Sequence, residues 1–330
     1  MQQRCGTSGV CALAVAWALW AGVPVVQASD ETPRPAVPAA MAALATESLL
    51  LDLAWTARGR LVAVGERGHI LLSDDFGASW RQAPSPVATT LTAVTFAEAG
   101  RGWAVGHDAV VLTTQDDGEK WEIVYRDPGF EAPFLDVLVL PDGRVLAGGA
   151  YGLYASTEGR ADAWSDRILD DADFHFNTAV RSAEGDLMIA GEFGEILISA
   201  DGGEAWAYTD SPYSGSFFGA VASDGWTAVF GLQGNLFVRP AGESDWQAVV
   251  TGATAGLLGG TVVPDGRLAV VGLSGTILIG DPLTGRMDLI QLPQREALAD
   301  IQVAPDGRVI LVGEAGILRY ESLGALAAGV

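Results

Sequence analysis

Short apolar segments separated by turn residues recur along most of the chain. Residues 91–96, 102–105, 110–114 and 121–125 form one such unit, in which each segment is rich in β-branched or aromatic side chains. This pattern predicts four short strands in each unit. No apolar stripe repeats every 3.6 residues, which excludes a stack of helices.

The unit recurs seven times in a constant glycine register. Two glycines six residues apart mark each unit: Gly59/Gly65, Gly100/Gly106, Gly143/Gly149, Gly185/Gly191, Gly225/Gly231, Gly266/Gly272 and Gly307/Gly313. A period of about 41 residues with four strands is typical of a β-propeller blade, and seven is a usual number of blades. The sequence therefore predicts an all-β fold, a seven-bladed β-propeller of four-stranded blades.

The last unit has only three strand segments before the chain runs out. Residues 36–45, which precede the first unit, are apolar, and we expect them to form a strand that completes the last blade and closes the ring. Such a strand would remove an open sheet edge. The expected boundaries are a signal peptide at 1–28, a linker at 29–38, the propeller at 39–321 and a C-terminal tail at 322–330.

The N-terminal segment resembles a cleaved secretory signal. Arg4 precedes an apolar stretch at residues 10–26, and Val26-Gln27-Ala28 offers a small-x-small cleavage site. An uncleaved membrane anchor is the alternative, and Gly22 and Pro24 disfavour it by breaking the stretch. Residues 246–264 carry no charge either, but they follow the repeat register and are expected to be strand, loop and strand. The predicted location is the periplasm, without membrane insertion after cleavage.

Charge narrows the possible partners. The chain has 41 acidic and 19 basic residues, for a net charge of −22. Nucleic-acid binding needs a basic footprint and is excluded. Both cysteines lie in the predicted signal segment, and the three histidines show no metal-ligand spacing. We expect no cofactor and no metal, and a monomer that binds a protein.

Three turns share the pattern Ser/Thr-x-Asp-x-Gly-x-x-Trp. They are Ser73, Asp75, Gly77 and Trp80; Thr114, Asp116, Gly118 and Trp121; and Ser199, Asp201, Gly203 and Trp206. The pattern resembles the Asp-box (BNR) repeat of sialidase-like propellers. The hydroxyl and carboxylate can hydrogen-bond the local backbone, so the motif indicates a hairpin turn and not a catalytic site.

A longer pattern resembles the photosystem II stability/assembly factor family. It comprises Leu91-Thr-Ala-Val-Thr-Phe96, Gly102-Trp-Ala-Val-Gly106 and the segment from Val111 to Trp121. The resemblance implies a seven-bladed exported propeller. It points to the branch found in bacteria without photosystems, often encoded near RND-type exporters. The photosynthetic members are associated with an arginine-rich contact surface, whereas this chain is acidic.

Two groups of residues are candidate sites. Asp52, Asp136 and Asp300 occupy equivalent places on innermost strands, where they would line the central channel; they could bind a cation or act on a sugar, or brace neighbouring blades through the backbone. The second group lies on turns and on loops between blades, which share one face: Phe130, Phe134, Asp171, Asp173, His175, Tyr213, Phe217, Glu66 and Glu192. These aromatic residues would anchor a partner if exposed, or pack between blades if buried.

The function predicted from these features is that of a protein-binding accessory or assembly factor for a membrane complex, with no catalytic residues. The alternative is a glycan-binding or glycoside-hydrolase-like propeller that uses the same face.

Overall fold

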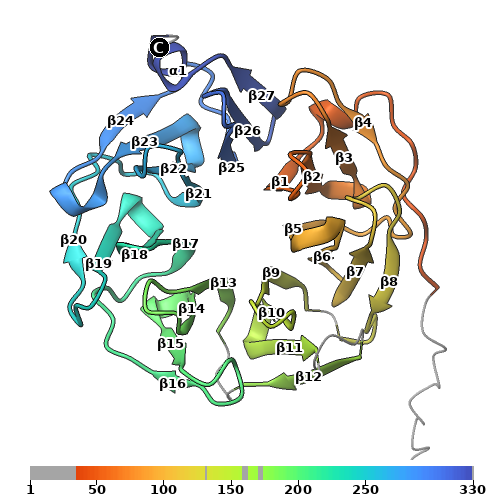
Figure 1. Cartoon of the computed structure of the whole chain (residues 1–330), viewed down its shortest axis with the longest axis horizontal. Helices are drawn as coiled ribbons and strands as arrows, with labels where there is room; N and C mark the ends of the chain where they lie inside the picture. Colours follow the sequence, from red (N-terminus) through yellow and green to blue (C-terminus); the bar gives the residue numbers. More distant parts are fainter. Residues whose placement is uncertain (1–34, 131, 158–162, 170–173, 329–330) are drawn as a thin grey trace, which may run out of the picture. The chain divides into compact units, whose positions relative to one another are not determined.

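Seven antiparallel sheets surround a central axis (Figure 1). The computed structural model describes residues 35–130, 132–157, 163–169 and 174–328. The predicted seven-bladed β-propeller is confirmed, and within each blade the strands follow chain order from the axis to the rim. The predicted signal peptide and most of the predicted linker lie outside the described residues.

Six blades have four strands each. Blade 1 contains β1 (Leu50–Trp55), β2 (Leu61–Gly65), β3 (Ile70–Ser73) and β4 (Arg81–Gln82); blade 2 contains β5 (Leu91–Phe96), β6 (Gly102–Gly106), β7 (Val110–Thr114) and β8 (Glu122–Tyr125). Blade 3 contains β9 (Phe134–Val139), β10 (Val145–Gly149), β11 (Leu153–Thr157) and β12 (Trp164–Ile168); blade 4 contains β13 (Phe176–Arg181), β14 (Leu187–Gly191), β15 (Ile196–Ser199) and β16 (Ala207–Tyr208).

The remaining blades follow the same plan, except that the last has three strands. Blade 5 contains β17 (Phe217–Ser223), β18 (Trp226–Gly231), β19 (Leu236–Pro240) and β20 (Gln247–Ala248); blade 6 contains β21 (Leu257–Val262), β22 (Leu268–Gly272), β23 (Thr276–Gly280) and β24 (Asp288–Gln291). Blade 7 contains β25 (Leu298–Val303), β26 (Val309–Gly313) and β27 (Gly316–Tyr320).

Short helical elements lie at turns and at the chain end. Single 3₁₀ turns are η1 (Ala45–Glu47), η2 (Glu66–Gly68), η3 (Glu98–Gly100), η4 (Ala150–Gly152), η5 (Glu192–Gly194), η6 (Leu232–Gly234), η7 (Leu273–Gly275) and η8 (Pro282–Thr284). The α-helix α1 (Leu323–Ala328) buries Leu326 against the core of blades 6 and 7, so the predicted C-terminal tail packs on the propeller. Among the described residues, none of the helices has the length and apolar character to cross a bilayer.

The hydrophobic core lies between neighbouring blades. On β6, Trp103 and Val105 pack with blade 3, while Ala104 packs with blade 1. Successive side chains of a strand point to opposite faces of its sheet, so a strand between two blades is buried on both sides. This explains why the second strands are continuous apolar runs. The uncharged stretch 246–264 is β20, a loop and β21, in the repeat register.

Ring closure differs from the prediction. Residues 36–45 form no strand beside β27; they run along blade 1, where Ala39 N donates to Ser85 O at 3.1 Å and Ala42 N to Gln82 Oε1 at 2.8 Å. Pro38 lacks a donor for a ladder, and the alanine-rich segment has low strand propensity. The ends of the ring instead meet through the innermost strands β1 and β25, where Gln302 Nε2 donates to Leu53 O at 3.1 Å.

Candidate functional site

The strands place the turns on two opposite faces of the ring. Turns between second and third strands lie at the same end of the blades as the loops that enter the next blade, and we call this end the loop face. Backbone hydrogen bonds join turn to loop: Glu192 N donates to His175 O at 3.2 Å, Leu232 N to Ser216 O at 2.9 Å and Leu273 N to Gly256 O at 2.8 Å. The loop face is therefore a fixed surface.

Two of the predicted binding aromatics are buried. Phe134 and Phe217 have no exposed surface, which corrects the expectation that they anchor a partner. Each is the first residue of an innermost strand and packs between two blades. Phe130 is partly buried against the core of blades 2 and 3. Tyr213 is half-buried, with its ring 6.1 Å from that of Phe217 and 5.9 Å from that of Phe237.

His175 and Glu192 do come together on the loop face. The His175 backbone N–H donates to Glu192 Oε2 at 3.1 Å, and Nδ1 lies 3.7 Å from the same oxygen. The ring of Tyr151 meets His175 edge-on, with centroids 4.8 Å apart. Glu66 lies on the equivalent turn of blade 1, beside Arg67. Asp171 and Asp173 lie outside the described residues.

Four exposed apolar side chains on the loop face were missed by the sequence analysis. Tyr151 is 52% exposed, Phe193 67%, Leu232 40% and Leu273 43%. They occupy the turns η4 to η7 of the consecutive blades 3 to 6, and we call them the tip arc. A signal was present in the sequence: each stands between two glycines of a turn, a place where polar residues are usual.

Tyr151 and Phe193 also adopt an unusual backbone conformation. Both have φ of 56°, in the left-handed region. Only glycine, and to a lesser extent asparagine and aspartate, enters this region at little steric cost. Two large aromatic residues are thus held in a disfavoured conformation with their side chains in solvent. The equivalent turn residues Arg67, Gln233 and Ser274 have φ of 57° to 59°, so the conformation belongs to the repeated turn. Blades 3 and 4 differ in placing large aromatic side chains there, in solvent.

The charges beside the tip arc are mostly acidic. On the described loop-face turns and loops of blades 4 and 5, the charged residues are Glu192, Glu195 and Asp210, and these segments contain no lysine or arginine. Asp210 is exposed and the two glutamates are half-buried. The loop that leaves blade 6 adds Glu296 and Arg295, and Arg295 lies against the turn η7. The arc is therefore an apolar surface with a mostly acidic border.

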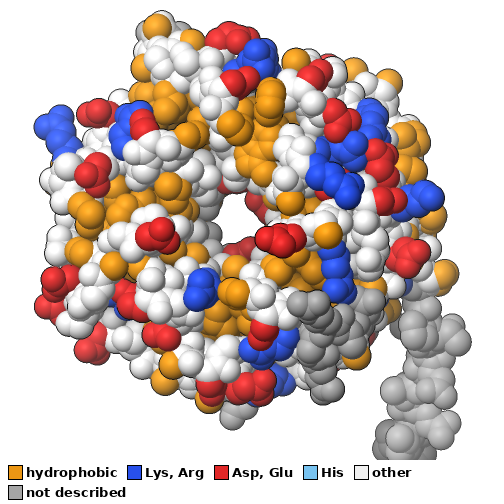
Figure 2. All heavy atoms as spheres, in the orientation of Figure 1, with side chains coloured by type: hydrophobic (Ala, Val, Ile, Leu, Met, Phe, Trp, Pro, Cys, Tyr) orange, Lys and Arg blue, Asp and Glu red, His pale blue; other side chains and the backbone are white. Residues whose placement is uncertain are grey.

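The predicted channel carboxylates do line the central opening, which is visible along the axis in Figure 2 with acidic side chains at its rim. The cavity measures about 620 Å³. Asp52 accepts from Leu53 N at 2.8 Å and from Val94 N of the next blade at 2.6 Å. Asp136 repeats the arrangement, with Val137 N and Ala179 N each at 2.7 Å.

Protonation is favoured in this channel. Burial raises the pKa of Asp136 to about 7 and raises that of Asp52. Burial and the nearby Asp52 raise the pKa of Asp300 well above its usual value, and the two carboxyl groups share a hydrogen bond. Two acids in direct contact cannot flank a sugar in the way that glycosidases require. The oxygens of Asp52 and Asp136 accept hydrogen bonds from backbone N–H groups of their own and the next blade. This geometry favours a structural role, in which the side chains hold neighbouring blades together.

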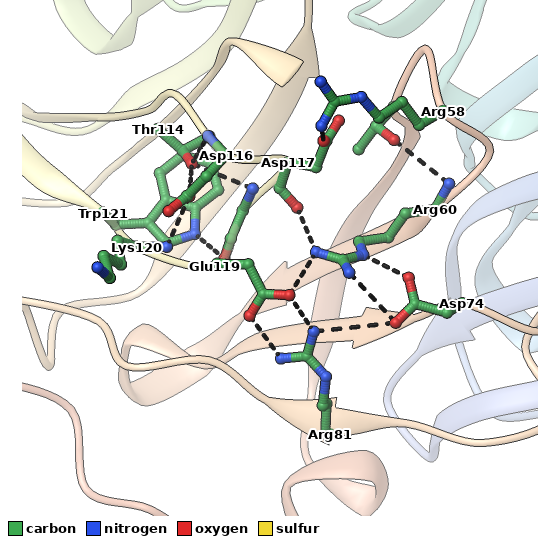
Figure 3. A network of polar contacts seen from close by, with 12 residues as sticks. Arg58, Arg60, Asp74, Arg81, Thr114, Asp116, Asp117, Glu119, Lys120 and Trp121 are labelled. Atoms are coloured by element: carbon green, nitrogen blue, oxygen red, sulfur yellow. Dashed lines mark hydrogen bonds and ion pairs between the residues drawn. The ribbon is translucent and has the colours of Figure 1, made fainter. Parts of the chain in front are cut away.

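The face opposite the loop face carries paired charges. Figure 3 shows the network where blades 1 and 2 meet: Arg60 Nε lies 2.6 Å from Asp74 Oδ1 and Arg60 Nη1 lies 2.8 Å from Glu119 Oε1. Arg81 also pairs with Glu119, and Arg58 Nη1 lies 2.7 Å from Asp117 Oδ2. The acidic and basic side chains of this network neutralise one another, so this region offers little unpaired charge to a ligand.

The Ser/Thr-x-Asp-x-Gly-x-x-Trp turns are hydrogen-bonded within themselves. Gly77 N donates to Ser73 Oγ at 2.9 Å, Ser79 N to Asp75 Oδ1 at 2.8 Å, and Trp80 Nε1 to Gly77 O at 3.2 Å. Equivalent bonds occur at Thr114, Asp116, Gly118 and Trp121, and at Ser199, Asp201, Gly203 and Trp206. The side chains therefore build the turns. Among the described residues, no three histidine, cysteine or carboxylate side chains gather as a metal site.

Fold and site together define a seven-bladed β-propeller with an exposed apolar arc on its loop face. Neither a protein-family model nor a curated protein sequence matches this chain. Solved structures do. The structure described as YCF48 bound to D1 peptide is 20% identical with a TM-score of 0.66, covering 88% of this chain and 97% of that one.

Two other structures are similar to a comparable extent. YCF48 from Cyanidioschyzon merolae is 18% identical with a TM-score of 0.62, covering 83% of this chain and 95% of that chain. The WD40 β-propeller domain of Doa1 is 12% identical with a TM-score of 0.66, covering 86% of this chain and 95% of that chain. At these identities the likeness shows a shared fold.

Proposed function

We propose that this protein is an exported propeller that binds another protein through its loop face, as an accessory or assembly factor for a membrane complex. The observation that carries the proposal is the tip arc, in which Phe193 is 67% exposed and Tyr151 52%. Exposed aromatic residues on a rigid surface are favoured as anchors in protein interfaces, because they contribute contact area at low entropic cost.

Two further lines support this role. One of the similar structures is described with a bound peptide, which makes peptide binding by a propeller of this shape a reasonable expectation. The predicted signal segment at residues 1–28 supports delivery to the periplasm. An RND-type exporter is the kind of membrane complex that the family resemblance suggests.

Asparagine variants separate function from stability at the tip arc. Asparagine tolerates the left-handed region better than an aromatic residue does. We expect the double variant Tyr151→Asn/Phe193→Asn to lose partner binding. Its free energy of unfolding, measured by urea denaturation, should equal that of the parent or exceed it by up to about 1 kcal/mol. A structural role for the two rings would instead lower stability.

Site-specific crosslinking tests the binding role. Phe193 is replaced by the photo-crosslinker p-benzoylphenylalanine in the full-length protein in cells, and Leu289, 42% exposed on the outer strand β24, serves as the matched control position. We expect one reproducible membrane-protein adduct from position 193 and none from position 289. Equal adducts from both positions, or none from position 193 at good expression, would contradict the proposal.

Export is tested on the same preparation. We expect the mature protein in the periplasmic fraction, with a mass that lacks residues 1–28. Recovery of the intact chain from the cytoplasm would overturn the export part of the proposal and leave the binding surface to be judged on the crosslinking alone.

A further inference from the structure

The tip arc also indicates what kind of partner it fits. Resting on the proposed binding function, we infer that the arc accepts a partner segment in which basic side chains alternate with, or flank, large apolar ones. The inference depends on two features of the same surface, its apolar tips and the sign of the charges between them.

The apolar tips lie on consecutive blades. Tyr151, Phe193, Leu232 and Leu273 follow one another on four consecutive blades, one at each turn. Leu273 also lies against the incoming loop, since a Cβ at Gly256 would be 3.4 Å from its side chain. Tyr151 and Phe193 are the second residues of their turns, whereas Leu232 and Leu273 are the first. A row of this kind suits a segment that crosses several blades, because each blade offers one apolar contact.

The charges require a basic partner. Glu192, Glu195 and Asp210 border the tips of blades 4 and 5, where the described loop-face segments contain no lysine or arginine to neutralise them. Arg295 stands at the far end of the arc, against the turn of blade 6. Burying acidic groups under an acidic or neutral partner would leave them unpaired, whereas basic side chains would pair with them.

The opposite face provides the contrast. There, Arg60 and Arg81 already neutralise Asp74 and Glu119, so a basic segment would have to displace existing ion pairs. The chain as a whole is acidic, and its field attracts basic segments in general. The loop face differs from the rest of the surface because it has exposed aromatic side chains beside its acidic groups. These side chains would fix the position of the partner.

Three short fluorescent peptides test the inference with the mature full-length protein. One alternates lysine with leucine and tryptophan; one has glutamate in place of lysine; one has serine in place of the apolar residues. We expect binding of the first, and affinities lower by about tenfold or more for the other two. Raising NaCl from about 50 mM to about 300 mM should weaken the first complex by screening its charges.

Variants locate the site. Tyr151→Asn/Phe193→Asn should weaken binding of the first peptide by about tenfold, and Glu192→Gln/Glu195→Gln should reduce its salt dependence. The matched control, Leu289→Asn on the outer rim, should leave the affinity within about twofold. Equal losses in the control and tip variants, or a preference for the glutamate peptide, would overturn the inference. A partner crosslinked from position 193 through an acidic segment would refute the inference while leaving the proposed function in place.

Discussion

The junctions between blades are of two kinds, and they lie in different parts of the ring. At each junction from blade 7 to blade 1 and onward to blade 5, a polar side chain of an innermost strand hydrogen-bonds with the backbone of the next blade. Asp52 accepts from Val94 N, and Asp136 accepts from Ala179 N. Thr92 Oγ1 donates to Phe134 O, and Asn177 Nδ2 to Phe217 O, both at 2.7 Å.

Between blades 5 and 7 the equivalent positions are glycine. A Cβ at Gly219 would lie 2.6 Å from Leu258 O, and one at Gly259 would lie 2.2 Å from Ala299 O. Here the backbones of neighbouring innermost strands approach directly, and no side chain bridges them. One side of the ring is therefore held by hydrogen bonds that include titratable groups, and the other by close backbone packing that no pH change alters.

The largest effect is expected at a glycine junction. Gly259→Ala would force a methyl group against Ala299 O and within 2.7 Å of Asp300 Oδ1, so the innermost strands must move apart. We expect a loss of about 3 kcal/mol in the free energy of unfolding, measured by urea denaturation. Gly225→Ala, where an added Cβ meets nothing within 4 Å, is the control. Similar losses for both variants would mean that close packing is not the cause.

A smaller loss is expected at a bridged junction. Asp52→Ala removes the acceptor of two N–H groups, those of Leu53 and Val94. Part of the loss is offset, because Asp52 no longer has to share the channel with Asp300. We expect a net destabilisation of about 2 kcal/mol, and about half of that for Asp52→Asn, which keeps one acceptor. If Asp52→Ala is neutral, the bridges do not hold the blades.

The pH dependence distinguishes the two sides further. The pKa of Asp136 is raised from 3.8 to about 7, so its contribution to stability is fully present below about pH 4 and is lost as the pH rises through 7. The parent protein should unfold at higher urea concentrations at about pH 5 than at about pH 8, and Asp136→Asn should flatten this slope. An unchanged slope in the variant would show that Asp136 is not responsible.

The smallest effect is expected away from the junctions, in a turn. Ser73→Ala leaves the buried Gly77 N without its acceptor and should cost about 1 kcal/mol. Hydrogen bonds from Ser79 lower the pKa of Asp75 to about 2, so its contribution is present above about pH 4 and is lost as the pH falls through 2. The slope between pH 5 and pH 8 should therefore be the same in Ser73→Ala and the parent.

The sequence alone determined the architecture of this protein. The glycine register, the apolar strand segments and the turns before Trp80, Trp121 and Trp206 are local signals, because strand period and turn geometry depend on a few neighbouring residues. It also placed Asp52, Asp136 and Asp300 on the channel wall, since equivalent positions in a repeat occupy equivalent places in the ring.

Only the tertiary structure decided which aromatic side chains face solvent. Phe217 begins a strand wedged between blades and is buried, whereas Phe193 stands at a turn tip between two glycines and is 67% exposed. It also decided how the ring closes: residues 36–45 run along blade 1, and β1 meets β25 directly. The glycines around Phe193 mark a turn, but the exposure of its side chain and the closure of the ring depend on contacts between residues far apart in the chain.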